Sequence, residues 1–140
     1  MAAERVAMKR GRPLSPHLQI YRPSITMVMS IVHRLTGMAL YLGTALLAWF
    51  LIAVASGPQQ YALVQAVMTS GPGRLVLIGY TWALLHHMLG GLRHFIWDTG
   101  RGFALPVVNR LSWLSIIGSL ALTAAIWSYV LLHGRVVVGG

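Results

Sequence analysis

The sequence has no cysteine and almost no acidic side chains, with 2 acidic residues against 11 basic ones among 140. The lack of cysteine excludes disulfides, iron–sulfur clusters, thiolate zinc sites and c-type haem attachment within this chain. Charged residues make up only 9% of the chain, whereas a typical soluble domain has about 25%. Because hydrophobic residues reach 56%, the composition excludes intrinsic disorder and indicates a membrane protein.

Three long uncharged apolar runs occupy residues 35–56, 75–92 and 111–132, and an apolar segment at 25–32 precedes the first. Each run has the roughly 18–20 residues that a helix needs to cross about 30 Å of hydrocarbon. Lipid offers no hydrogen bonds to the backbone, so the runs are expected to be helices. The predicted fold class is an all-α membrane protein with three transmembrane helices, which form part of a heteromeric helical bundle.

Glycine and proline mark the expected breaks between these spans. Gly57-Pro58 ends the first span, Gly71-Pro72-Gly73 precedes the second, and a short interfacial helix is expected at 59–69. Pro106 and Asn109 are expected to break the chain before the third span. The expected segments are a cytoplasmic N-terminal segment (1–24), a span (25–56), an external connection (57–73), a span (74–97), a cytoplasmic connection (98–109), a span (110–133) and an external tail (134–140).

The basic residues predict the orientation of the chain. Nine of the eleven fall in the N-terminal segment, at the start of the first span or in the second connection, and only Arg74 and Arg135 fall on the other side. By the positive-inside rule the N-terminus is cytoplasmic and the C-terminus lies outside. Because the cations flank apolar runs and form no basic face, the predicted partner is a lipid bilayer and not nucleic acid.

Polar residues inside a span are costly and are candidates for function. Ser30 and Arg34 share a face of the first helix because they are four residues apart, and His33 lies beside them. In one interpretation Arg34 extends to the headgroups and Ser30 bonds to its own helix backbone. In the other, the hydroxyl and the guanidinium bind a ligand carbonyl or an anion at the membrane edge.

The second span carries two adjacent histidines, His86 and His87. A neutral imidazole in lipid has to place one donor and one acceptor, so hydrogen bonding between helices and haem or metal ligation both fit. His86 shares a helical face with Gly90 and Arg93. His87 shares a helical face with the residues at +4, +7 and +11, which are Gly91, His94 and Asp98. Gly91 has no side chain, so it leaves room on this face for a flat macrocycle. The spacing alone leaves open which imidazole is a ligand.

The first two spans run antiparallel, so several polar residues converge near the cytoplasmic boundary: Ser30, His33, Arg34, Arg93, His94 and Asp98. Such a cluster at one membrane face is typical of a site for an amphipathic redox ligand. Asp98 has two interpretations, an ion pair with Arg93 or Arg101, and a proton donor for a quinone.

Three motifs carry a family resemblance. The segments Arg12-Pro13-Leu14-Ser15-Pro16-His17-Leu18-Gln19-Ile20-Tyr21, Ser30-Ile31-Val32-His33-Arg34-Leu35-Thr36-Gly37 and His87-Met88-Leu89-Gly90-Gly91-Leu92-Arg93-His94-Phe95-Ile96-Trp97-Asp98 resemble signatures of the cytochrome b556 subunit family of succinate dehydrogenase, the large membrane anchor of complex II. The resemblance extends over residues 12–132.

The resemblance implies a subunit that helps to bind haem b and ubiquinone, so that electrons from succinate oxidation reach the quinone pool. The implied partners are a second small membrane anchor subunit, an iron–sulfur subunit and a flavoprotein subunit. FAD, the iron–sulfur clusters and the dehydrogenase chemistry belong to those partners, and the second anchor subunit supplies the second axial haem ligand. The implied site residues are His87 as axial ligand of the haem iron, Ser30, Arg34 and Asp98 at the quinone, and His33, Arg93 and His94 near the haem propionates.

Two alternatives stay open at this point. One is a structural membrane anchor without a functional haem, and the other is a fumarate-reductase-type anchor that uses menaquinol. The N-terminus is short and has no long Arg/Ser-rich presequence, which favours a bacterial inner membrane over the mitochondrial inner membrane.

Overall fold

The computed structural model describes residues 22–137, with side chains as far as His133. The motif at 12–21, the N-terminal cations before Arg22 and the side chain of Arg135 therefore lie outside the described residues. Within the described part there are four helices and no strand: α2 (Ile25–Ser56), α3 (Pro58–Thr69), α4 (Gly71–Asp98) and α5 (Leu105–Val137).

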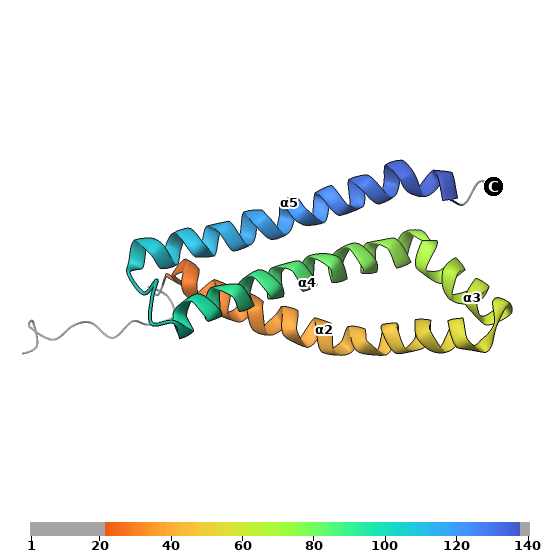
Figure 1. Ribbon diagram of the computed structural model, residues 1–140, viewed down its shortest axis with the longest axis horizontal. Helices are drawn as coiled ribbons and strands as arrows, with labels where there is room; N and C mark the ends of the chain where they lie inside the picture. Colours follow the sequence, from red (N-terminus) through yellow and green to blue (C-terminus); the bar gives the residue numbers. More distant parts are fainter. Residues whose placement is uncertain (1–21, 138–140) are drawn as a thin grey trace, which may run out of the picture.

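Three of the helices are long and apolar enough to cross a membrane: Ile25–Ser56, Gly71–Asp98 and Leu105–His133. This confirms the all-α membrane class with three spans. Figure 1 shows the three long helices running alongside one another, with α4 between α2 and α5 and the short α3 joining α2 to α4 at one end. The start of α2 and the end of α4 lie together at the opposite end.

The turns between helices follow from glycine and proline chemistry. Gly57 has a φ of 113°, which favours glycine, and it ends α2 directly before Pro58 opens α3. Ser70 caps α4, where its hydroxyl accepts a hydrogen bond of 3.2 Å from the Gly73 amide. Pro106 does not break the chain as expected. It lies in the first turn of α5, where the missing N–H costs no helical hydrogen bond.

The interior of the helix bundle is small and largely polar. Among residues 22–133 only four hydrophobic residues are buried, whereas large apolar side chains such as Tyr41 (78% exposed) and Leu132 (73% exposed) cover the outside. The buried polar residues lie on the helix faces that meet one another: Thr36, His86, Arg93, Ser112, Ser115, Ser119 and Thr123. This inside-out distribution suits a chain surrounded by lipid and by other apolar helices.

Candidate functional site

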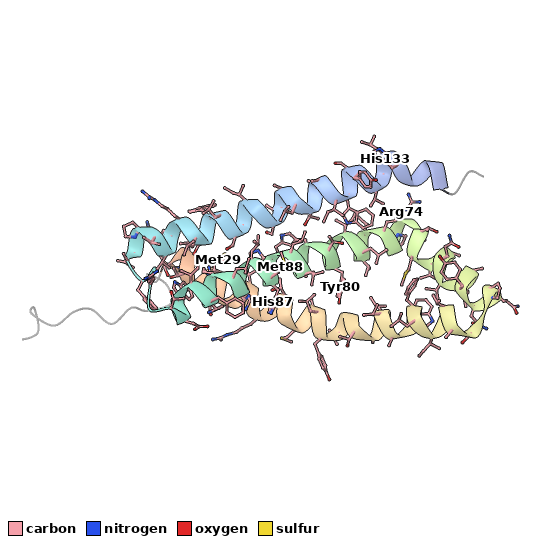
Figure 2. The ribbon with its side chains drawn as sticks, in the orientation of Figure 1. Met29, Arg74, Tyr80, His87, Met88 and His133 are labelled. Atoms are coloured by element: carbon pink, nitrogen blue, oxygen red, sulfur yellow. The ribbon has the colours of Figure 1, made fainter. Side chains whose placement is uncertain are left out.

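The two adjacent histidines of α4 face different neighbouring helices. Successive residues of an α-helix are about 100° apart, so His86 and His87 cannot share a face. His86 is only 2% exposed and contacts α5 through Ser119. His87 is half-buried and contacts α2, and Figure 2 shows it on the side of α4 nearer to α2.

The contacts of His87 define which of its ring nitrogens carries a proton. Its Nδ1 lies 3.1 Å from the backbone oxygen of His33 and 3.3 Å from the hydroxyl of Thr36. A carbonyl oxygen only accepts, so Nδ1–H is the donor, and in the neutral imidazole Nε2 carries the lone pair. No hydrogen bond within residues 22–137 occupies Nε2. This is the tautomer in which a histidine binds a metal, with its other nitrogen held by a backbone carbonyl.

Glycines allow the imidazoles to lie close to the opposite helix. A Cβ added to Gly37 of α2 would lie 2.9 Å from Cε1 of His87, and a Cβ added to Gly90 of α4 would collide with the ring of His33. Each helix therefore has a glycine at the point where an imidazole of the other helix packs against it. Both positions need the absence of a side chain, because a Cβ this close would force the ring to move.

The imidazoles of His33 and His87 stack face to face, with centroids 4.0 Å apart and planes 4° from parallel. A ring nitrogen binds metal in the plane of its own ring, so two stacked rings cannot hold one iron from opposite sides. His33 is therefore not arranged as a second ligand opposite His87. Its Nδ1 is buried without a hydrogen-bond partner in the described part of the chain, and the ring of His94 lies 5.2 Å away.

The α4–α5 contact includes three side chains hydrogen-bonded to hydroxyl groups. The Ser119 hydroxyl lies 3.2 Å from Nδ1 of His86, and the Ser112 hydroxyl accepts from Arg93 at 3.2 Å. Further along, Thr81 accepts from the indole of Trp127 at 3.2 Å. The side chain of Arg93 is thus directed to α5, where its guanidinium also lies 5.0 Å from the Trp97 ring. It does not join the histidines at the α2 face.

The three residues predicted for the quinone are all exposed: Ser30, Arg34 and Asp98. The Ser30 hydroxyl makes no hydrogen bond within residues 22–137, in contrast to Thr36, whose hydroxyl donates to Val32 at 2.9 Å. Asp98 forms no ion pair with any residue in the described part of the chain, Arg93 and Arg101 included. These three side chains are therefore available to a ligand or to a partner chain.

No group of three or more His, Asp or Glu side chains within residues 22–137 is placed to hold a metal ion. A haem needs only an axial ligand and space, and His87 offers the ligand nitrogen. The space lies one turn further, where an added Cβ at Gly91 would meet nothing within 4 Å. The residues present therefore fit one half of a bis-imidazole haem site.

Two kinds of contributing residue were not identified from the sequence. Thr36 and Gly37 belong to a quoted motif, but nothing in the spacing shows that they touch His87. The hydroxyl residues of α5 follow a stripe with spacings of three and four residues: Ser112, Ser115, Ser119 and Thr123. That period is a signal for a buried face, and it could have located the partners of His86 and Arg93.

Comparisons with known proteins agree with these motifs. A family model described as "Succinate dehydrogenase/Fumarate reductase transmembrane subunit" matches residues 8–126. The succinate dehydrogenase cytochrome b556 subunit of Paracoccus denitrificans is 41% identical over 116 residues, which cover 82% of this chain and 89% of the relative. The corresponding subunit of Rickettsia conorii is 35% identical, covering 83% and 90%. The mitochondrial cytochrome b560 subunit of Mus musculus is 35% identical, covering 80% and 65%.

Proposed function

Since this chain belongs to the family of succinate dehydrogenase/fumarate reductase transmembrane cytochrome b subunits, we propose that it holds haem b and ubiquinone in a succinate:ubiquinone oxidoreductase. A second small membrane anchor subunit completes the membrane part. A flavoprotein subunit with FAD and an iron–sulfur subunit carry out succinate oxidation and deliver the electrons.

His87 is the proposed axial ligand of the haem iron. The observation that carries this assignment is the donation of its Nδ1–H to the His33 carbonyl, which leaves Nε2 free to bind metal. When bound, haem b supplies reversible one-electron transfer at its iron. The stacked ring of His33 is not arranged to bind the same iron, and by the family resemblance a second imidazole would come from the second anchor subunit.

The remaining polar side chains have proposed roles toward the haem propionates. Nε2 of His33 is not among the buried atoms, and the exposed His94 lies beside this ring at 5.2 Å, so both suit a carboxylate as charge-assisted or neutral donors. Arg93 is included in the same proposal. The guanidinium has five N–H donors, so it keeps its hydrogen bond to Ser112 while another N–H donates to the carboxylate.

Ser30 and Arg34 are the proposed quinone ligands, with Asp98 nearby. Donors fixed beside a quinone oxygen stabilise the negative charge that develops there during reduction. The hydroxyl of Ser30 has no partner within the described residues, and the Asp98 carboxyl is exposed, so it is suited to relay protons from the aqueous side. A site at the membrane edge suits a reaction that takes electrons from a hydrophilic donor and protons from water.

A reduced-minus-oxidised optical spectrum of the purified complex tests the haem assignment. The wild-type complex should show a b-type band, and His87→Ala should lose it, because no neighbouring residue replaces the ligand without moving the helix. His86→Ala is the matched control and should retain the band. A band lost only in His86→Ala would transfer the ligand to His86, and a wild-type complex without a band would favour a purely structural anchor.

Two parallel assays test the quinone assignment. Ser30→Ala and Arg34→Ala should lower ubiquinone reduction at least tenfold and leave succinate oxidation by a soluble dye unchanged. Ser56→Ala is the control on the same helix, because Ser56 is also exposed but donates to its own Ile52 carbonyl at 2.7 Å. Equal losses in both assays would contradict the assignment, and faster turnover with menaquinol would favour the fumarate-reductase type.

The proposed location is a bacterial inner membrane, with the N-terminus and the α4–α5 connection on the cytoplasmic side. Because the native chain has no cysteine, single introduced cysteines report accessibility without background from this subunit. Arg101→Cys should react with a membrane-impermeant thiol reagent only from the cytoplasmic side, and Gln60→Cys only from the outside. The reverse pattern would contradict the orientation.

A further inference from the structure

His86 is one of the most fully buried polar side chains of the protein, and the proposed function does not use it. It is 2% exposed, and its ring lies between the hydroxyl of Ser119 and the ring of Trp82, whose centroid is 5.2 Å away. Its Nε2 is buried and has no partner among the described residues, so the chain itself closes that nitrogen off from an external macrocycle. A buried imidazole in a span is costly and calls for a specific role.

The direction of the hydrogen bonds at α5 is fixed by the serines. The Ser119 hydroxyl donates its only proton to the Ile116 carbonyl at 2.9 Å, so it accepts from Nδ1–H of His86. Ser112 repeats the arrangement, since it donates to the Val108 carbonyl at 2.9 Å and accepts from Arg93. At these two points helix α5 presents hydroxyl lone pairs, and α4 presents the matching donors.

The two hydrogen bonds have the same spacing on both helices. His86 and Arg93 are seven residues apart, as are Ser112 and Ser119, which corresponds to about 10.5 Å along each axis. Two fixed points on one face determine both the rotation and the axial register of α4 against α5. Apolar contacts alone determine these weakly in lipid, where polar groups and close packing supply the specificity.

We propose that His86 is a positioning residue for the haem ligand, and this rests on the proposed function of His87. The hydrogen bond from His86 to Ser119 sets the rotation of α4 at which Nδ1–H of His87 meets the His33 carbonyl. Because the two histidines are about 100° apart on the same helix, a rotation that releases His86 from α5 also turns His87 away from that carbonyl. The hydrogen bond of His86 on the α5 side of α4 thus orients the open Nε2 of His87 on the α2 side.

A spectroscopic consequence separates positioning from ligation. The hydrogen bond from Nδ1–H makes an imidazole ligand more basic, and a more basic ligand stabilises ferric iron. Loosening the His87–His33 contact should therefore raise the haem midpoint potential and broaden the low-spin EPR signal, while the haem stays bound. Loss of a ligand would instead remove the haem.

The test uses the complete complex with variants at His86 and Ser119. His86→Leu and Ser119→Ala should each keep at least half of the haem per flavin, raise the midpoint potential and broaden the EPR signal. His86→Asn keeps a donor at the Nδ1 position and should restore both readouts toward wild type. The double variant His86→Leu/Ser119→Ala should add nothing to the single ones, because both remove the same bond. His133→Leu, at an exposed histidine that bonds only to its own helix, is the matched control.

A second readout does not depend on haem. An added Cβ at Gly118 of α5 would lie 3.3 Å from Cδ1 of Leu89 of α4, so a short bifunctional thiol reagent should cross-link the pair Leu89→Cys/Gly118→Cys. His86→Leu should lower the yield of this cross-link at least twofold, and His86→Asn should restore it. Unchanged cross-linking together with an unchanged EPR signal in haem-loaded His86→Leu and Ser119→Ala would overturn the positioning role and leave the function of His87 intact. Haem loss in His86→Leu with retention in His87→Ala would overturn both.

Discussion

The two faces of α4 handle their histidines in opposite ways. On the face toward α5, His86 and Arg93 donate to serine hydroxyls whose protons are committed to their own helix. On the face toward α2, the rings of His87 and His33 stack over glycines, and only the Nδ1 side of His87 is hydrogen-bonded within the described residues. The first face joins two helices of one chain, and the second leaves ligand positions open to a group from outside.

Burial therefore separates a positioning histidine from a candidate ligand, although the two are adjacent. Nε2 of His86 is buried without a partner in the described part of the chain, whereas Nε2 of His87 is not among the buried atoms. A ligand nitrogen needs access as well as a lone pair. The more buried imidazole is thus the poorer candidate for the iron.

The largest expected effect comes from filling the glycine under His33. Gly90→Leu should destabilise the helix bundle by about 1–3 kcal/mol, the usual range for overpacking, because the new side chain collides with the His33 ring. Thermal unfolding of the detergent-solubilised complex measures the loss. Gly79→Leu is the matched control on the same helix, since nothing lies within 4 Å of its Cβ position, and equal destabilisation by both would show that the α2 face is not closely packed there.

The neighbouring glycine should separate haem binding from packing. Gly91→Val places a branched side chain in space that this chain leaves empty, so it should lower the haem per flavin by more than half while the unfolding temperature of the haem-free complex changes little. Gly79→Val should change neither. A full haem content in Gly91→Val would mean that the macrocycle does not approach α4 at this turn.

The fold class and the family could be predicted from the sequence, because hydrophobic length and short motifs are local properties of the chain. Three apolar runs indicate three spans whatever their packing. The predicted fold class and the predicted family were both confirmed. The end of the second connection was not predicted correctly, because Pro106 was interpreted as a break although proline is also favoured in a first turn. Nothing in the residue types distinguishes these two uses of proline.

The packing of the candidate site could be predicted only in part. The spacing of Gly91, His94 and Asp98 along α4 follows from helix geometry, but the contact of His87 with Gly37 depends on the axial register of α2 against α4, which one sequence does not contain. Arg93 illustrates the same limit. Its position on the face of His86 was visible from the period, whereas its bond to Ser112 depends on α5. The roles of His87, Ser30, Arg34 and Asp98 remain proposals for the experiments above.

The smallest effect is expected at Thr36, which tests what holds His87 on the α2 face. Its hydroxyl lies 3.3 Å from Nδ1 of His87, longer than the 3.1 Å to the His33 carbonyl, and it also bonds to its own helix at 2.9 Å. The carbonyl is thus the main acceptor and the hydroxyl a secondary one.

Thr36→Val removes the hydroxyl at nearly constant volume and should lower the stability of the helix bundle by about 0.6 kcal/mol, the average for a polar contact between membrane helices. Thr36→Ser, which keeps the hydroxyl, should preserve the haem spectrum, and Thr36→Val should shift it only slightly. Complete loss of haem in Thr36→Val would instead make the hydroxyl the group that orients the ligand, and the α2 face would then resemble the hydroxyl-bonded α5 face.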